Sequence, residues 1–182
     1  SIEKGIPQAT VSGLTPNTTY WAWARAINHE EEPTNWTVWG PKATDPNLPN
    51  AVVAELGVDR AKNVDIRWGG NGNPAGTTYI VKLIRFGTGD TFEAPFKFSS
   101  PILQSETADN LVSTFSELTP NTTYRVRVDA VGHNGRVASS DVQEVSTQAS
   151  MLADPILSAG EIDPLRQIKV AWTDDKNPTG TK

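Results

Sequence analysis

The sequence repeats itself at an interval of 104 residues, and this repeat restricts the possible folds more than any other feature. The phrase SGLTPNTTYWAWA at 12–24 returns as SELTPNTTYRVRV at 116–128. A second phrase, RWGGNGNPAGTTY at 67–79, is matched by AWTDDKNPTGTK at 171–182. The landmarks that keep this interval are Leu14 and Leu118, Pro16 and Pro120, Tyr20 and Tyr124, Trp68 and Trp172, Asn73 and Asn177, Pro74 and Pro178, and Gly76 and Gly180. So many landmarks at one interval indicate duplicated domains.

Two short proline-containing stretches, TDPNLPN at 44–50 and TQASMLADP at 147–155, are typical of linkers between such units. The predicted divisions are the C-terminal part of a repeat at 1–48, a complete repeat at 49–152 and the N-terminal part of a further repeat at 153–182. The two partial units together lack a counterpart of residues 79–104, which should contain a core strand. We therefore expect a window on a longer tandem array, in which neighbouring repeats complete each partial unit.

Apolar and polar residues alternate with period two through most of the complete unit, which is typical of half-buried strands. The expected strands are 52–56, 64–68, 79–84, 91–98, 113–118, 124–130 and 139–147. Turn signals such as GNGNPAGT and GHNGR separate them. Seven short strands in about 100 residues predict an all-β fold, an antiparallel β-sandwich.

The complete unit resembles a fibronectin type III domain in three features. They are a strand that ends in Trp68, the turn from Leu118 to Tyr124 that enters the next strand, and the alternating arginines after it. The resemblance implies a core tryptophan, and a leucine and a tyrosine at the corner that leads into strand F. The core roles that it implies fall on Trp68, Trp172, Leu14, Tyr20, Leu118 and Tyr124. The phrasing is similar to bacterial fibronectin repeats, which implies an extracellular or cell-surface protein.

The residues after the LTPNTTY phrase differ between its two copies. Trp21 and Trp23 stand where the complete unit has Arg125 and Arg127. These tryptophans should point outward from their strand, and NWTVWG adds two more near the next strand. The expected patch consists of Trp21, Trp23, Arg25, Trp36 and Trp39. Because each indole offers about 150 to 250 Å², such a patch indicates an interface.

Three interpretations of the patch remain open. Trp36 and Trp39 could cover the sheet edge while Trp21 and Trp23 stack on Arg25 through cation–π contacts. The patch could instead pack against a neighbouring repeat, a copy of the same chain or another surface protein. The third interpretation is that the rings bind a polysaccharide by stacking on its sugars.

The composition excludes several classes of function. A net charge of −5 without a basic stripe argues against nucleic-acid binding, because phosphates require clustered lysine and arginine. The absence of cysteine excludes disulfides, thiolate metal sites and cysteine nucleophiles. No apolar run approaches the roughly 20 residues that a membrane-spanning helix needs, so we expect no membrane insertion by this segment.

No residue pattern indicates catalysis, a cofactor or a metal. His29 and His133 occupy equivalent positions in successive units and should lie too far apart to share a metal. Asp174 and Asp175 should lie in a loop, and the sequence around them offers no evident apolar pocket to shift a pKa. We expect a non-catalytic spacer or fibre segment, with a binding module or the spacer of a secreted polysaccharide-degrading enzyme as alternatives.

Three asparagines, Asn17, Asn35 and Asn121, stand in N-x-T sequences. In a eukaryotic secretory protein they would be glycan acceptors. Because the repeats are similar to bacterial ones, we expect bare side chains.

Overall fold

The computed structural model describes residues 8–87, 92, 97–99, 101–104, 110–151, 156–159, 168–171 and 176–179. Every regular element among them is a β-strand, and all strand pairs are antiparallel. The predicted all-β, antiparallel class is therefore confirmed. The described part of the chain holds no helix with the length and apolarity that crossing a bilayer requires.

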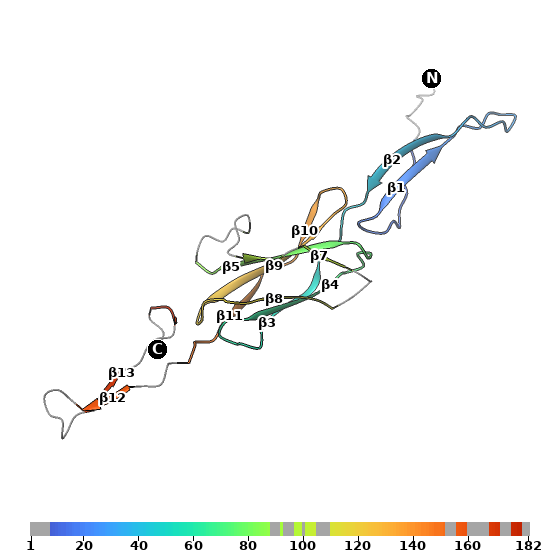
Figure 1. Ribbon diagram of the computed structural model, residues 1–182. Coiled ribbons are helices and arrows are strands. Elements are labelled where there is room, and N and C mark those ends of the chain that lie inside the picture. Colours follow the sequence, from blue (N-terminus) through green and yellow to red (C-terminus); the bar gives the residue numbers. More distant parts are fainter. Residues whose placement is uncertain are drawn as a thin grey trace.

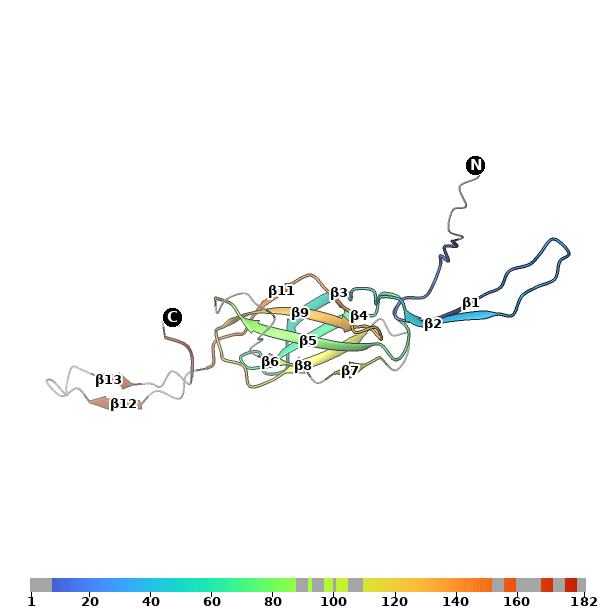
Figure 2. The same ribbon diagram turned by 90° about the horizontal axis from the view of Figure 1, so that it is seen from above.

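The strands form a central sandwich and two hairpins. Figures 1 and 2 show one hairpin extending from each end of the sandwich. The first hairpin pairs β1 (Thr19–Ala24) with β2 (Thr37–Ala43), and the second pairs β12 (Ile156–Ala159) with β13 (Ile168–Ala171). Trp172 comes directly after β13 and lies outside the described residues.

The sandwich contains two sheets. One has the strand order β3 (Asn50–Leu56), β4 (Val64–Gly69) and β8 (Leu111–Phe115). The other is centred on β5 (Thr78–Arg85) and β9 (Thr123–Val131), flanked by β6 (Lys97–Phe98), β7 (Ile102–Leu103), β10 (Val137–Ser139) and β11 (Gln143–Ser146). This strand order is that of fibronectin type III and immunoglobulin-like sandwiches.

The core lies between the sheets and agrees with the predicted alternation. Its fully buried residues are Val64, Ile66, Trp68, Tyr79, Val81, Leu83, Tyr124, Val126, Val128 and Ala130. Trp68 is 1% exposed, and its ring centroid lies 5.8 Å from that of Tyr79 at an interplanar angle of 56°. Because Trp68 comes from β4 and Tyr79 from β5, this ring pair connects the two sheets.

Two expected strands have different boundaries in the structure. The strand expected at 113–118 is β8, which ends at Phe115 because Glu117 adopts a left-handed φ of 55° that breaks extended pairing. The strand expected at 139–147 is divided into β10 and β11. There the Ser140 hydroxyl accepts a hydrogen bond from Val128 N at 3.0 Å, and an extra residue enters the pairing with β9. Of the strand expected at 91–98, only Lys97–Phe98 is described as a strand.

The tyrosine corner forms in both copies of the LTPNTTY phrase. The Tyr124 hydroxyl accepts a hydrogen bond from Thr119 N at 3.0 Å, and the Tyr20 hydroxyl accepts one from Thr15 N at 2.9 Å. The two corners differ in burial. Tyr124 and Leu118 are buried, whereas Tyr20 is half-buried and Leu14 is 41% exposed.

Leu14 is therefore exposed and Tyr20 half-buried in this structure, and their core roles stay predictions for a completed repeat. The cause lies in packing, because β1 and β2 pair only with each other among the described strands. Leu118 and Tyr124, by contrast, are covered by the facing sheet of the sandwich. The corner is set by local hydrogen bonding, but burial requires a second sheet.

Replacement of Trp68 tests the importance of the ring pair. Trp68→Ala should lower the free energy of unfolding by about 3 to 5 kcal/mol through lost burial and a cavity. Trp68→Phe should cost less, because the indole N–H of Trp68 has no hydrogen-bond partner among the described residues. Urea unfolding followed by far-UV circular dichroism measures both. Equal losses for Trp68→Ala and the exposed-site control Trp23→Ala would contradict this account of the core.

Candidate functional site

The β1–β2 hairpin has an irregular register. Trp23 pairs with Val38 and Ala22 with Trp39, but Tyr20 pairs with Lys42, so β2 contains an extra residue near Gly40. Gly40 is required there, because a Cβ at this position would lie 2.9 Å from Tyr20 O and 3.1 Å from Trp21 Cδ1. This bulge lets Trp21 lie against the backbone of β2.

The register separates the four tryptophans. Directly paired residues point to the same side of a hairpin, so Trp39 shares a side with Ala22, while Trp23 points to the other. The expectation that all four would gather on one face is therefore wrong for Trp39. We call the side that carries Trp21, Trp23, Arg25, Trp36 and Val38 the tryptophan face. The other side, with Tyr20, Ala22, Ala24 and Trp39, corresponds to the core side of β9 in the sandwich.

Both sides of the hairpin expose large aromatic surfaces. The exposed fractions are 50% for Trp21, 60% for Trp23, 58% for Trp36 and 60% for Trp39. The Arg25 guanidinium lies 4.6 Å from the centroid of the Trp36 ring. A cation–π stack thus forms, although on Trp36 and not on the two tryptophans of β1.

The sandwich fills the equivalent positions differently. Arg125 lies over the Phe86 ring at 4.6 Å, and its Nε is 2.7 Å from the Glu144 carboxylate. Arg127 lies over the Phe92 ring at 4.7 Å and hydrogen-bonds Asp129. The pattern Arg-x-Arg-x-Asp of β9 is therefore replaced in the hairpin by Trp-x-Trp-x-Arg. Aromatic groups and cations exchange places, and the cation–π type of contact is kept.

Asp129 is the main electrostatic centre of this outer face. Its carboxylate is almost fully buried and contacts Lys82 Nζ at 2.9 Å and Arg127 Nε at 2.8 Å. Burial by itself raises the pKa of Asp129, but the hydrogen bonds from Arg127, Lys82 and Ser139 and the charge of Arg127 together outweigh burial. The pKa of Asp129 therefore lies below its ordinary value.

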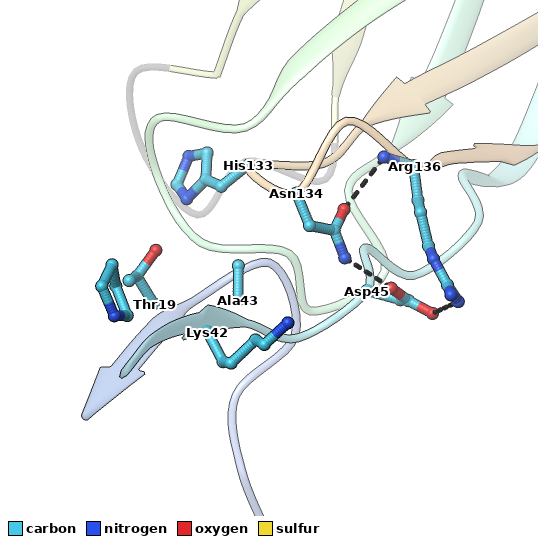
Figure 3. Close-up of a pocket in the computed structure, with 8 residues that line it drawn as sticks. Thr19, Lys42, Ala43, Asp45, His133, Asn134 and Arg136 are labelled. Atoms are coloured by element: carbon cyan, nitrogen blue, oxygen red, sulfur yellow. Dashed lines mark hydrogen bonds and ion pairs between the residues drawn. The ribbon is translucent and has the colours of Figure 1, made fainter. Parts of the chain in front are cut away.

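A polar cavity of about 630 Å³ lies where the hairpin meets the sandwich. Figure 3 shows its lining residues, which come from β1, β2, the linker and the β9–β10 turn: Thr19, Pro41, Lys42, Ala43, Asp45, His133, Asn134 and Arg136. Asp45 Oδ2 lies 3.1 Å from Arg136 Nη1, and Asn134 Nδ2 donates to Asp45 Oδ1 at 2.6 Å. Sequence reasoning did not single out these three residues, because nothing in their local pattern signals a contact with a distant segment.

The cavity lies between the β1–β2 hairpin and the sandwich, and polar side chains line most of it. Its ion pair is solvent-exposed on both sides, so it contributes little to stability. His133 lines the cavity, whereas His29 is exposed in the loop between β1 and β2. Within the described ranges, no group of three or more histidine, cysteine, aspartate or glutamate side chains is arranged to hold a metal.

No protein-family model matches the sequence, and no curated protein matches it. Solved structures with a similar fold include domains d3–d4 of the rat CD45 extracellular region, with a TM-score of 0.48 and 15% identity over 81% of this chain and 73% of that one. The FN1–FN3 domains of chicken CNTN1 give 0.45 and 17% over 75% of this chain and 45% of that one. The FN5 domain of Drosophila Lar gives 0.38 and 21% over 58% and 99%. The chain thus spans less than half of the CNTN1 fragment.

The Asp129 network gives a pH-dependent prediction. Because the folded pKa is depressed, its stabilisation is fully present above the unfolded pKa near 3.9 and is lost as pH falls through the folded value. Asp129→Asn should therefore lower the free energy of unfolding at pH 7, by about 1 to 3 kcal/mol for a buried charged hydrogen-bond acceptor. The difference from the parent should shrink below about pH 4.

Chemical denaturation at a series of pH values measures this difference. Asp141→Asn is the matched control, since Asp141 is an exposed aspartate just beyond β10. A deficit for Asp129→Asn that stays constant down to pH 2 would show that its effect is steric.

Proposed function

We propose that this chain is a non-catalytic spacer segment of a tandem array of fibronectin type III-like repeats in a cell-surface or secreted protein. The observation that carries the proposal is the succession of the strands along one direction, with one hairpin extending from each end of the central sandwich. A chain arranged in this way suits a molecule that separates other domains.

The arrangement of the units supports the same role. The two hairpins extend from opposite ends of the sandwich in both views (Figures 1 and 2). Within the 104-residue repeat, the first hairpin corresponds to the end of a unit and the second to the beginning of one. The proposed units are therefore 1–48, 49–152 and 153–182, with neighbouring repeats as the partners that complete the outer two.

The β1–β2 hairpin fits this interpretation. Its side with Tyr20, Ala22, Ala24 and Trp39 corresponds to the side of β9 that is buried in the sandwich. In a completed unit this side would be covered by a facing sheet. The exposed Trp39 would then be a core residue of the preceding repeat.

Small-angle X-ray scattering of the 182-residue chain tests the spacer role. A compact chain of this length has a radius of gyration of about 16 Å, and we expect a clearly larger value with the pair-distance distribution of an elongated particle. A value near the compact limit would contradict the spacer role. Measurement at several protein concentrations separates elongation from self-association.

The tryptophan face supports a second candidate function, the binding of a polysaccharide or another surface protein. Trp21, Trp23 and Trp36 are each at least half exposed on one side of the hairpin. Such rings stack on sugars or anchor protein interfaces. If the bound polysaccharide is a substrate of the parent protein, the segment would serve as the spacer of a polysaccharide-degrading enzyme.

Glycan-array binding by the parent and by Trp21→Ala/Trp23→Ala separates these possibilities. Binding that is lost in this double variant but kept in Trp39→Ala would support recognition through the tryptophan face. The Trp39 variant is a matched control, because it removes an equally exposed indole from the other side. No glycan signal, with dissociation of an assembly in the double variant, would instead favour packing between copies of the chain.

A further inference from the structure

Asn73 holds the linker through two hydrogen bonds to a single residue. Asn47 N donates to Asn73 Oδ1 at 2.8 Å, and Asn73 Nδ2 donates to Asn47 O at 2.8 Å. One buried side-chain amide therefore satisfies both backbone groups of a linker residue, as a neighbouring strand would. The linker is bound directly to the sandwich.

The same contact recurs at the second junction. Ser150 N donates to Asn177 Oδ1 at 2.7 Å, and Asn177 Nδ2 donates to Ser150 O at 3.1 Å. Asn177 is also buried, and it stands 104 residues after Asn73 in the same NPxGT phrase. The reciprocal pair is thus a property of the repeat and not of one linker.

Asn73 is in turn attached to the sandwich core. The Asn73 Nδ2 also donates to the Tyr79 hydroxyl at 3.2 Å. The backbone carbonyl of Asn73 accepts a hydrogen bond from Gln104 Nε2 at 3.0 Å. The Tyr79 hydroxyl donates to Gln104 Oε1 at 2.9 Å. Burial raises the pKa of Tyr79, which keeps this hydroxyl protonated and able to donate. The asparagine therefore cannot rotate without breaking a buried network.

A second asparagine, Asn17, contacts the sandwich from the first unit. Asn17 belongs to the LTPNTT turn of the first unit and is 0% exposed. Its Nδ2 donates to Thr77 Oγ1 at 3.0 Å, and its Oδ1 accepts from His133 N at 2.8 Å. The side chain thus lies between the NPxGT loop and the β9–β10 turn, and removing it would leave buried polar groups without a partner.

The linker also packs tightly against the sandwich. A Cβ added at Gly132 would lie 2.8 Å from Pro46 Cδ, closer than real Cβ contacts allow. Three consecutive linker residues are therefore held against the sandwich: Asp45 by a hydrogen bond from Asn134, Pro46 by the contact with Gly132, and Asn47 by the hydrogen bonds with Asn73.

We infer that the LTPNTT turn and the NPxGT loop are the two sides of one interface, through which each repeat binds the next copy of itself in a fixed orientation. This inference rests on the proposed spacer role and adds that the spacer is stiff. Because the two sides are different surfaces, the contact is head-to-tail and extends without closing, as an array requires. The inference also gives a reason why the LTPNTT and NPxGT phrases are the ones that recur, since each repeat would need both sides of the interface.

Pulsed electron–electron double resonance on the whole chain tests the stiffness. The chain has no cysteine, so Thr37→Cys and Val112→Cys place spin labels only on the hairpin and on the sandwich. We expect a single narrow distance distribution. Asn17→Ala should broaden it about twofold or more, because interdomain motion is the default where an interface is weak. Asn73→Ala should do the same if the sandwich remains folded, which far-UV circular dichroism checks.

Asn177→Ala is the matched control for Asn73→Ala, since it removes the equivalent pair of hydrogen bonds, those with Ser150, at the other junction. It should leave the Thr37–Val112 distribution unchanged. A broad distribution in the parent, or one that stays narrow in Asn17→Ala, would overturn the inference. Either result is distinguishable from failure of the spacer role, which scattering reports independently. A narrow distribution with a compact particle would keep the interface and reject the spacer.

Discussion

The contact between Trp68 and Tyr79 is the interaction on which the rest of the structure depends. The two rings come from opposite sheets and fill the centre of the sandwich, with centroids 5.8 Å apart. The Tyr79 hydroxyl then reaches out of the apolar core to the Asn73 and Gln104 side chains. Asn73 holds the linker. Tyr79 thus connects the core to the segment around Asn47, because its ring packs among apolar side chains while its hydroxyl forms hydrogen bonds.

The outer faces of the hairpin and the sandwich show how one strand pattern supports two surfaces. In the sandwich, Arg125 and Arg127 lie over phenylalanine rings. Arg127 also binds the buried carboxylate of Asp129, and Arg125 binds the carboxylate of Glu144. In the hairpin, tryptophans occupy the arginine positions and Arg25 the aspartate position. Arg25 accordingly stacks on Trp36. The exchange keeps a cation on an aromatic ring but removes the anion, which leaves an apolar face where the sandwich has a charged one.

Much of the central unit was predictable, because period-two alternation directly reports which side of a strand is buried. The core positions on β4, β5 and β9 could be read from it, as could the antiparallel sandwich. Strand ends were less predictable, since Ser140 and Glu117 interrupt pairing through a hydroxyl contact and a left-handed φ. Trp36 and Trp39 are three residues apart, so alternation alone predicts that they lie on opposite sides of the hairpin. Which of the two shares a side with Trp23 could not be predicted, because an extra residue in β2 sets the register. The contacts of Asn73 with Asn47 could not be predicted either, because the repeat interval marks Asn73 as a landmark but does not indicate its partner.

The sequence by itself determined the repeat, the class of fold and the local corners, because all three depend on alternation and on hydrogen bonds between residues close in the chain. Tyr20 and Tyr124 make the same corner bond for this reason. Only the tertiary structure decided which of these residues are buried and what the repeated asparagines contact. Asn17 meets Thr77 and His133, which lie 60 and 116 residues away. Such contacts depend on how distant segments of the chain pack, and no local pattern of residues encodes that packing.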